Sequence, residues 1–189
     1  PISRTLIAGH NELTITLHKM DSGVDSGDIL DVETIKIEST DDVNDLYKKA
    51  TKAASVLIYK NLHVINSGIY ELTHQDLSLK PEANGKMTRD ECKINWNDSV
   101  KKITDKVRAL TSPYPGAFFE YDGKDFIIDF AMPALNLNQI KKIDMQKSEL
   151  PNDNTAKVKY ISDETMHILC KDGVIIVSKL RNVEGFSQF

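Results

Sequence analysis

Residues 13–37 read LTITLHKMDSGVDSGDILDVETIKI, two runs of alternating apolar and polar side chains with a loop between them. Alternation with a period of two is typical of half-buried β-strands, so we predict strands over residues 13–20 and 29–37. The sequence therefore predicts a pair of strands joined by an acidic, glycine-containing loop. Three aspartates and two glycines make up its distinctive part: Asp21, Asp25, Asp28, Gly23 and Gly27.

The next segment changes to the period of a helix. Apolar residues between Val43 and Ile65 recur three and four positions apart, which predicts a long amphipathic helix. The sequence STDD at residues 39–42 offers capping oxygens and acidic groups for the start of this helix, and Gly68 is predicted to end it. Two strands covered by such a helix indicate the C-terminal part of an α/β domain.

The chain begins within another predicted helix. Pro1 would lie in its first turn and Gly9 at its end, with the apolar run ISRTLIA between them. A complete domain seldom begins in this way. We therefore expect the chain to be a fragment of a longer protein.

The remaining sequence predicts a second domain. Residues 76–93 are polar, lack a sustained period and contain Pro81, so we assign them to a linker between a first domain, 1–75, and a second, 94–189. A helix is predicted from about Asn97 to the stop signal SPYPG. Five strand-like runs follow and suggest a small β-barrel or a meander: residues 117–121, 125–131, 157–161, 166–170 and 173–180.

Composition argues against several classes of protein. No apolar run approaches the ~20 residues that cross a bilayer, and the N-terminus lacks the layout of a signal peptide. We therefore expect a cytoplasmic location and no membrane partner. Cys92 and Cys170 lie far apart and outside any CxxC motif, which favours packed thiols and no metal site. The net charge is −4, so an RNA partner would depend on one local patch: Lys101, Lys102, Lys106 and Arg108.

The residues of the acidic loop alone permit two interpretations. The spacing of Asp21, Asp25 and Asp28 does not match the alternating ligands of a calcium loop, and the loop serines lack the G-x-S-x-G context of a nucleophile. The loop is then either a turn built from Asx-type hydrogen bonds and glycines, or the carrier of a carboxylate that handles protons. The pattern leaves both interpretations open.

Two segments carry a resemblance to a known family. PISRTLIAG, residues 1–9, with TITLHKMDSGVDSGDIL, residues 14–30, resembles the second half of the catalytic domain of folate-dependent formyltransferases. INWNDSVKKITDKVRALTSPYPGAF, residues 94–118, resembles the start of a C-terminal domain found in the methionyl-tRNA and amino-sugar-nucleotide members. The second match places ten residues in the family pattern: Ile94, Trp96, Ile103, Val107, Arg108, Ala109, Pro113, Pro115, Gly116 and Ala117.

This resemblance implies both a fold and a reaction. The fold would be α/β, the C-terminal half of a formyltransferase Rossmann-like domain followed by a small OB-like β-barrel domain. The reaction would transfer a formyl group from 10-formyltetrahydrofolate to a primary amine. Of the family's catalytic Asn, His and Asp, only the Asp has a counterpart here, Asp25, so this chain alone is expected to be catalytically incomplete. The other loop residues would line the pterin pocket: Met20, Asp21, Gly23, Val24 and Gly27.

Three further expectations concern His18, Trp96 and the acceptor. His18, on the first predicted strand, is expected to be a packing or loop-orienting residue, and Trp96 is expected to pack in the second domain. The sequence PYPGAF, residues 113–118, and the lack of a basic C-terminal domain favour an amino-sugar nucleotide as acceptor. Methionyl-tRNA is the alternative acceptor, and a non-catalytic binding module is the second alternative.

Overall fold

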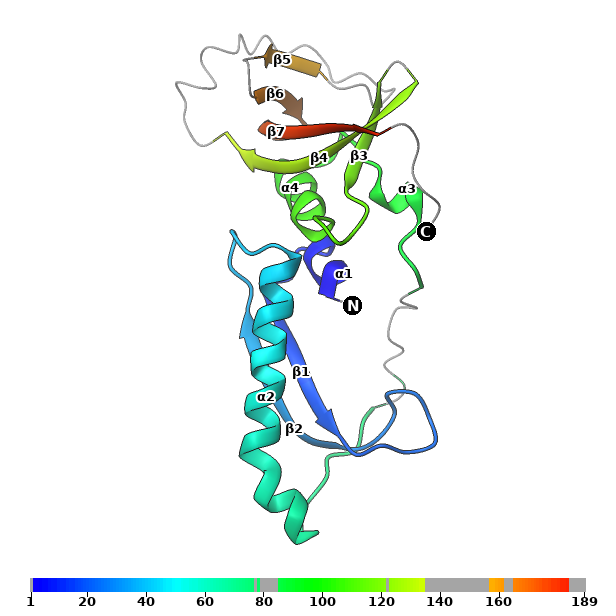
Figure 1. Cartoon of the computed structure of the whole chain (residues 1–189), viewed down its shortest axis with the longest axis vertical. Helices are drawn as coiled ribbons and strands as arrows, with labels where there is room; N and C mark the ends of the chain where they lie inside the picture. Colours follow the sequence, from blue (N-terminus) through cyan, green and yellow to red (C-terminus); the bar gives the residue numbers. More distant parts are fainter. Residues whose placement is uncertain are drawn as a thin grey trace. The chain divides into compact units, whose positions relative to one another are not determined.

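The computed structural model describes residues 2–76, 78, 85–121, 123–134, 157–161 and 165–183 (Figure 1). The chain folds into two compact units. Unit 1 comprises Pro1–Ile2 and His10–Lys86, and unit 2 comprises Ser3–Gly9 and Met87–Phe189.

Unit 1 contains the predicted pair of strands. Strand β1 (Glu12–His18) pairs antiparallel with strand β2 (Ile29–Lys36), and the register shifts between Leu17 and His18. Both strand predictions are confirmed, with ends within two residues of the expected positions. The irregularity at His18 lies directly before the acidic loop, where a bulge changes the direction in which side chains point.

The predicted long helix of unit 1 is also confirmed. Helix α2 (Val43–Ser67) lies along both strands (Figure 1), and Gly68 ends it in a left-handed conformation with φ 69°. The Asp42 side chain accepts hydrogen bonds from backbone N–H groups at the start of the helix. The Asp45 side chain accepts one from the Asp42 N–H, and the two residues form a capping box. The face towards the strands buries Val43, Leu46, Ala50, Ala53 and Leu57.

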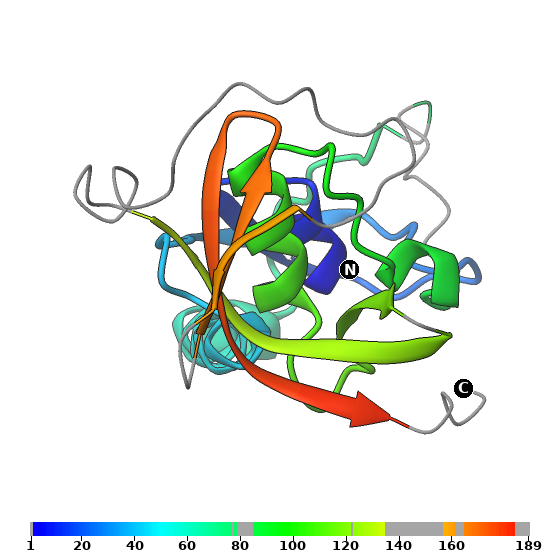
Figure 2. The same ribbon diagram turned by 90° about the horizontal axis from the view of Figure 1, so that it is seen from above.

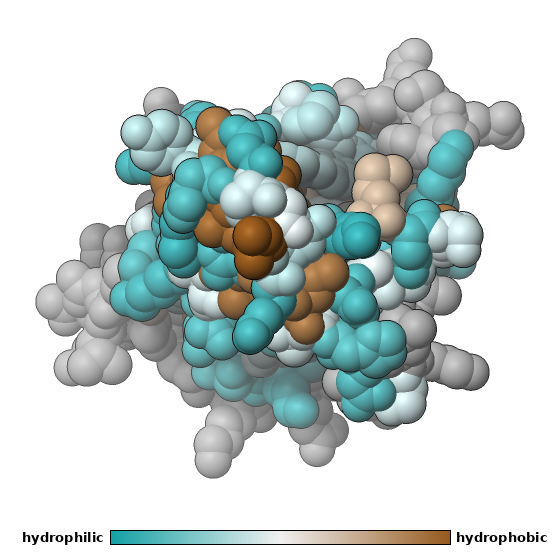
Figure 3. Space-filling model, turned by 90° about the horizontal axis from the view of Figure 1, so that it is seen from below, coloured by the Kyte–Doolittle hydropathy of each residue, from teal (hydrophilic) through white to brown (hydrophobic). Residues whose placement is uncertain are grey.

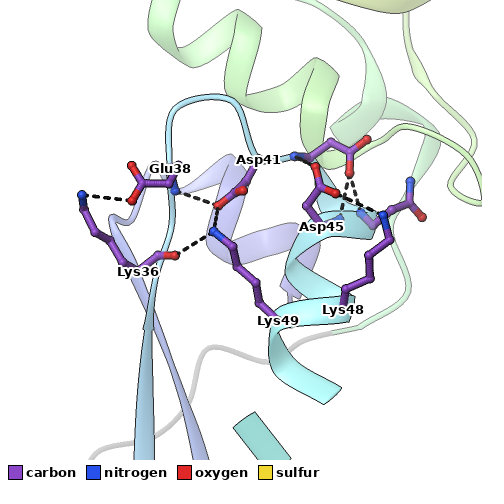
Figure 4. Close-up of polar contacts among 8 residues, drawn as sticks. Lys36, Glu38, Asp41, Asp45, Lys48 and Lys49 are labelled. Atoms are coloured by element: carbon purple, nitrogen blue, oxygen red, sulfur yellow. Dashed lines mark hydrogen bonds and ion pairs between the residues drawn. The ribbon is translucent and has the colours of Figure 1, made fainter. Parts of the chain in front are cut away.

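A charged cluster fixes the turn between β2 and α2 (Figure 4). Oδ2 of Asp41 accepts a bond from the Glu38 backbone N–H at 2.7 Å and lies 2.5 Å from Nζ of Lys49. The same Lys49 ammonium donates to the Lys36 carbonyl oxygen at 3.2 Å. Because Asp41 is buried, these charge-assisted bonds hold the last residues of β2 to the second turn of α2.

Helix α2 leaves large apolar side chains on its outer surface. Figure 3 shows a face on which such side chains lie between hydrophilic ones. The exposed apolar side chains of α2 and of the residues just after it are Tyr47, Val56, Ile58, Tyr59, Leu62, Ile65 and Ile69. Helix α2 is therefore amphipathic with an apolar face wider than the strip that packs on β1 and β2.

Asp31 supplies a pH-dependent link between β2 and α2. Its Oδ2 accepts bonds from Nδ2 of Asn61 at 2.8 Å and from Nζ of Lys60 at 2.9 Å. These bonds, with that from Asn61 the largest, lower the pKa of Asp31 to about 2.

We predict that Asp31 stabilises the fold above the pKa of the unfolded carboxyl, about 4, and that this contribution is lost as pH falls towards 2. Solvent screening limits it to about 1 kcal/mol. Urea unfolding followed by circular dichroism from pH 5 to pH 2 should therefore show a smaller pH dependence for Asp31→Asn than for the unsubstituted chain. Equal pH dependence in the two proteins would contradict the prediction, and Glu71→Gln, at an exposed position of the same unit, serves as control.

Unit 2 is a helix packed in the curve of an antiparallel sheet (Figure 2). Its sheet order is β3-β4-β7-β6-β5, and helix α4 (Val100–Ala109) packs on β4 and β7. The strands are β3 (Ala117–Tyr121), β4 (Lys124–Pro133), β5 (Lys157–Ile161), β6 (Thr165–Cys170) and β7 (Gly173–Val183). The predicted helix and all five predicted strands are confirmed.

The closed OB-like barrel expected for this domain is not confirmed. Strands β3 and β5 lie at the two edges of the sheet, and no pairing joins them among the described residues. The sheet is a half-barrel around α4 (Figure 2). Alternation along each strand predicts which face is buried, but it carries no information on whether the two edge strands meet.

Two short helices complete unit 2. Helix α1 (Ile2–Ile7) is followed by Gly9 at φ 74°, as expected from the glycine stop. Helix α3 (Arg89–Cys92) lies within the range that the sequence assigned to the linker, and Thr88 and Glu91 form a capping box at its start. The guanidinium of Arg4 contacts the Glu91 carboxylate at 2.6 Å, and this contact lowers the pKa of Glu91 to about 2.

The core of unit 2 contains both cysteines and the tryptophan. Trp96 is 2% exposed and meets the ring of Phe119 edge-on, with centroids 5.5 Å apart. Cys92 and Cys170 are buried free thiols, and burial raises their pKa values to about 11 and about 12. The predictions that these cysteines are packed thiols and that Trp96 packs inside the domain are therefore confirmed.

Candidate functional site

The acidic loop between β1 and β2 is closed at its base by the backbone. The Lys19 N–H donates to the carbonyl oxygen of Asp28 at 2.9 Å. A Cβ atom on Gly27 would overlap the carbonyl oxygen of Lys19, and one on Gly23 would overlap the Ser26 hydroxyl. The backbone therefore leaves no room for a side chain at Gly27, whereas at Gly23 a side chain would have to displace the Ser26 hydroxyl.

The Asp21 side chain stabilises the loop through hydrogen bonds to other loop residues. Its Oδ1 accepts one bond from the Gly23 N–H at 2.9 Å and another from the Ser26 hydroxyl at 2.8 Å. These bonds, the one from Ser26 first, lower the pKa of Asp21. The turn interpretation of the loop thus holds for this aspartate, because its carboxylate is satisfied by Asx-type contacts within the loop.

Asp25 differs from Asp21 in both backbone and side chain. Its backbone is left-handed, with φ 54°, and its side chain is 91% exposed. One carboxylate oxygen lies 4.0 Å from Nε2 of His18, whose Nδ1 lies 3.4 Å from the Lys19 carbonyl oxygen. A left-handed conformation is uncommon outside glycine, although Asp adopts it more readily than most residues. The fold therefore presents the Asp25 carboxylate outward, with an imidazole beside it.

Two apolar side chains of the loop are also exposed. Met20 is 87% exposed and Val24 is 92% exposed. Both side chains lie in the same loop as the exposed Asp25 carboxylate. Of the five residues predicted for the pterin pocket, Met20 and Val24 have solvent-exposed side chains. The other three, Asp21, Gly23 and Gly27, make contacts within the loop.

A third segment of unit 1 holds this loop, and it was not predicted from the sequence. The Thr73 backbone exchanges two hydrogen bonds with Ile29, each 2.8 Å. Nδ1 of His74 lies 2.6 Å from Oδ1 of Asp28, and the Gln75 amide donates to the carbonyl oxygens of Asp25 and Gly27. These residues lie in a polar run without periodicity, so no sequence signal marks them.

The close approach at Gly27 leads to a testable expectation. Gly27→Ala should destabilise the loop by about 1–3 kcal/mol, because the new methyl group must displace the Lys19 carbonyl. Amide exchange should show faster exchange of the Lys19 N–H, which Asp28 protects in the native loop. Gly85→Ala is the matched control, since a Cβ there meets no atom within 4 Å. Equal protection of Lys19 in the two variants would refute the packing argument.

The basic residues considered for RNA binding are engaged within unit 2. Three of them form short ion pairs with Asp105 on α4 or with Asp98 just before it: Lys101 with Asp105 at 2.6 Å, Lys102 with Asp98 at 2.8 Å, and Arg108 with Asp105 at 2.8 Å. The fourth, Lys106, donates to the Lys93 carbonyl oxygen at 2.8 Å, and burial lowers its pKa. Two carboxylates, Asp98 and Asp105, thus partly compensate the four basic side chains.

Neither a metal centre nor a membrane-spanning helix is found in the described part of the chain. Within the described ranges, no group of three or more His, Cys, Asp or Glu side chains is placed to hold a metal ion. None of the described helices combines the length and apolar character needed to cross a bilayer.

The architecture resembles that of proteins solved with bound folates. HypX from Aquifex aeolicus, solved with tetrahydrofolic acid, superimposes with a TM-score of 0.66 at 21% identity, over 97% of this chain and 29% of HypX. An N-formyltransferase from Helicobacter canadensis, solved with folinic acid and dTDP-3-aminofucose, gives a TM-score of 0.60 at 20% identity, over 95% of this chain and 60% of that protein. The described fold is thus shared with both of these proteins.

The sequence itself matches the same group. The family model "Formyl transferase" matches residues 1–62, and "Formyl transferase, C-terminal domain" matches residues 86–185. The chain belongs to the formyl transferase family, and the resemblance seen in the two sequence segments is confirmed.

Curated relatives extend over almost the whole chain. Methionyl-tRNA formyltransferases of Rickettsia massiliae and Rickettsia africae are 28% and 29% identical to it over 98% of its length. The chain spans 57% of the length of these relatives.

Proposed function

We propose that this chain forms part of an enzyme that transfers a formyl group from 10-formyltetrahydrofolate to a primary amine. The observation that carries the proposal is the match of two formyl transferase family models, in order, along one chain. The exposed Asp25 carboxylate within the first of these matches supports it. Relatives of the same fold solved with tetrahydrofolic acid or folinic acid support the folate donor.

The proposed reaction is an acyl transfer. The amine nitrogen attacks the formyl carbon, a new C–N bond forms, and the carbonyl oxygen takes the negative charge of a tetrahedral intermediate. Collapse of the intermediate restores the carbonyl and breaks the bond between the formyl carbon and N10 of the folate. The amine loses a proton and N10 gains one, so tetrahydrofolate leaves with N10 as a neutral amine.

Asp25 would serve the proton transfers in this sequence of steps. A carboxylate near the attacking amine can accept its proton, or can orient an imidazole that does so. Hydrogen-bond donors at the carbonyl oxygen would stabilise the oxyanion, and in the family these come from an Asn and a His in an N-x-H-x-S segment. That segment does not occur within residues 1–189, so Asp25 is the member of the catalytic set that this chain would contribute.

The same loop would receive the pterin ring of the donor. Met20 and Val24 supply apolar surface on which a planar ring can lie, and the loop backbone offers hydrogen-bonding groups at its edge. Gly23 and Gly27 keep the loop compact, which leaves space for the ring beside Asp25.

For the acceptor we propose an amino-sugar nucleotide. Binding of a tRNA depends on several Lys or Arg contacts to phosphates, and three of the four α4 basic residues form ion pairs with Asp98 or Asp105. Methionyl-tRNA is the second candidate, because relatives named methionyl-tRNA formyltransferase match this chain at 28–29% identity. Cytoplasmic location is proposed with either acceptor, since the buried free thiols suit a reducing compartment.

A side-by-side assay tests the proposal. The polypeptide as its gene encodes it, including any residues that precede Pro1, is given 10-formyltetrahydrofolate with amino-sugar nucleotides or with methionyl-tRNA. We expect formylated sugar nucleotide, at a rate that changes little between 50 and 200 mM salt. Formylation of methionyl-tRNA alone, with a steep loss of binding at high salt, would assign the second acceptor. Folate binding without transfer to any amine would favour the non-catalytic binding module.

A further inference from the structure

We infer that Gln75 is a positioning residue that holds the Asp25 loop in its reactive conformation, an inference that rests on the proposed formyl transfer. Nε2 of Gln75 donates to the carbonyl oxygen of Asp25 at 3.2 Å and also to the carbonyl oxygen of Gly27. A Gln amide carries two N–H donors, so one side chain can satisfy both carbonyls. The bonds therefore hold the backbone at Asp25 itself and two residues further on.

Gln75 is delivered to the loop by its two preceding residues. Thr73 pairs with Ile29 through reciprocal backbone bonds, as a short addition to the start of β2. His74 then contacts the Asp28 carboxylate, with Nδ1 and Oδ1 2.6 Å apart. These two anchors fix the segment over the loop, and they leave the Gln75 side chain within reach of the loop carbonyls.

The loop needs such an anchor because its backbone is strained at Asp25. Asp25 has a φ of 54°, a left-handed conformation that is unfavourable for a residue with a Cβ atom. The Asp25 side chain is 91% exposed and its nearest described partner, His18, is 4.0 Å away, so side-chain contacts contribute little to holding it. Bonds from Gln75 to the backbone stabilise this conformation and leave the carboxylate available to substrate.

The test distinguishes the effect of the hydrogen-bond donors of Gln75 from the effect of its side-chain size. Gln75→Glu keeps the size of the side chain but replaces both N–H donors with acceptors, and it would face two carbonyl oxygens. Gln75→Lys keeps a flexible N–H donor of similar reach. Glu71→Gln is the control, at an exposed position earlier in the same segment. Steady-state formyl transfer is measured with the full polypeptide for each variant.

We expect Gln75→Glu to lower kcat by about 10- to 100-fold, the range that a small misplacement of a catalytic group produces. The KM values for folate donor and amine should change less than about threefold. Gln75→Lys should recover most of kcat, and Glu71→Gln should match the unsubstituted protein. Wild-type kcat in Gln75→Glu would overturn the inference while leaving the proposed function intact. A loss confined to KM or to thermal stability would also overturn it, since Gln75 would then have a structural role only.

Failure of the proposed function is detected separately. If the unsubstituted protein transfers no formyl group to any acceptor, the proposed function fails before any variant is compared. In that case the inference is tested by amide exchange of the Lys19 and Gly23 N–H groups, which donate to the Asp28 carbonyl and the Asp21 carboxylate in the native loop. Faster exchange in Gln75→Glu than in Glu71→Gln would retain Gln75 as the anchor of the loop, and equal exchange would overturn it.

Discussion

Asp25→Asn is expected to lower formyl transfer by about 100-fold or more while leaving the fold intact. General acid–base groups contribute roughly 10²- to 10⁴-fold to a reaction rate, and an amide can neither accept the amine proton nor stabilise a protonated imidazole. The loop should survive the change, because the Asp25 side chain is exposed and its conformation depends on backbone contacts from Gln75. The measurements are kcat with the preferred acceptor and the far-UV circular dichroism spectrum.

Asp45→Asn provides the matched control for this prediction. It removes the same charge from unit 1 at a position on the first turn of α2, outside the acidic loop. Its kcat should stay within about twofold of the unsubstituted protein. Rapid turnover in Asp25→Asn would remove Asp25 from the proposed mechanism, and a changed circular dichroism spectrum would show that the side chain acts through folding instead.

Trp96→Ala is expected to destabilise unit 2 by about 3–5 kcal/mol, the usual cost of truncating a large buried aromatic side chain. Trp96 is 2% exposed and contacts Phe119 on β3, so its removal leaves a cavity between the segment before α4 and the sheet. The melting temperature should fall by roughly 12–20 °C, with a parallel decrease in the urea midpoint.

Two further substitutions distinguish packing from ligand stacking at Trp96. Tyr121→Ala removes an aromatic side chain that is 70% exposed on the same strand as Phe119, and it should cost less than about 1 kcal/mol. Trp96→Phe should recover part of the stability and leave KM for both substrates unchanged. Weaker substrate binding in Trp96→Phe, with normal stability, would mean that the indole contacts a ligand.

Sequence periodicity predicted the regular elements because each has a local signal. The period-2 alternation in residues 13–17 and the three- and four-residue spacing from Val43 to Ile65 both reflect burial of one face. Gly68 marked the end of α2 through its conformational freedom. Helix α3 was missed because four residues are too few to show a helical period.

The site was predicted in part for the same reason. The loop sequence singled out the aspartates, but the distinction between a braced Asp21 and an outward-facing Asp25 depends on which hydrogen bonds form in three dimensions. The contacts of His74 and Gln75 join positions 46 to 50 residues apart, through polar groups that leave no pattern along the chain. Closure of the half-barrel likewise depends on edge strands distant in sequence.

The location of the two thiols has a practical consequence for labelling. Both cysteines of the chain, Cys92 and Cys170, lie in unit 2, and their raised pKa values leave almost no thiolate at neutral pH. Maleimides and similar reagents should therefore spare the native protein. A fluorophore attached through Val24→Cys would then report from the acidic loop alone, without prior removal of either natural cysteine.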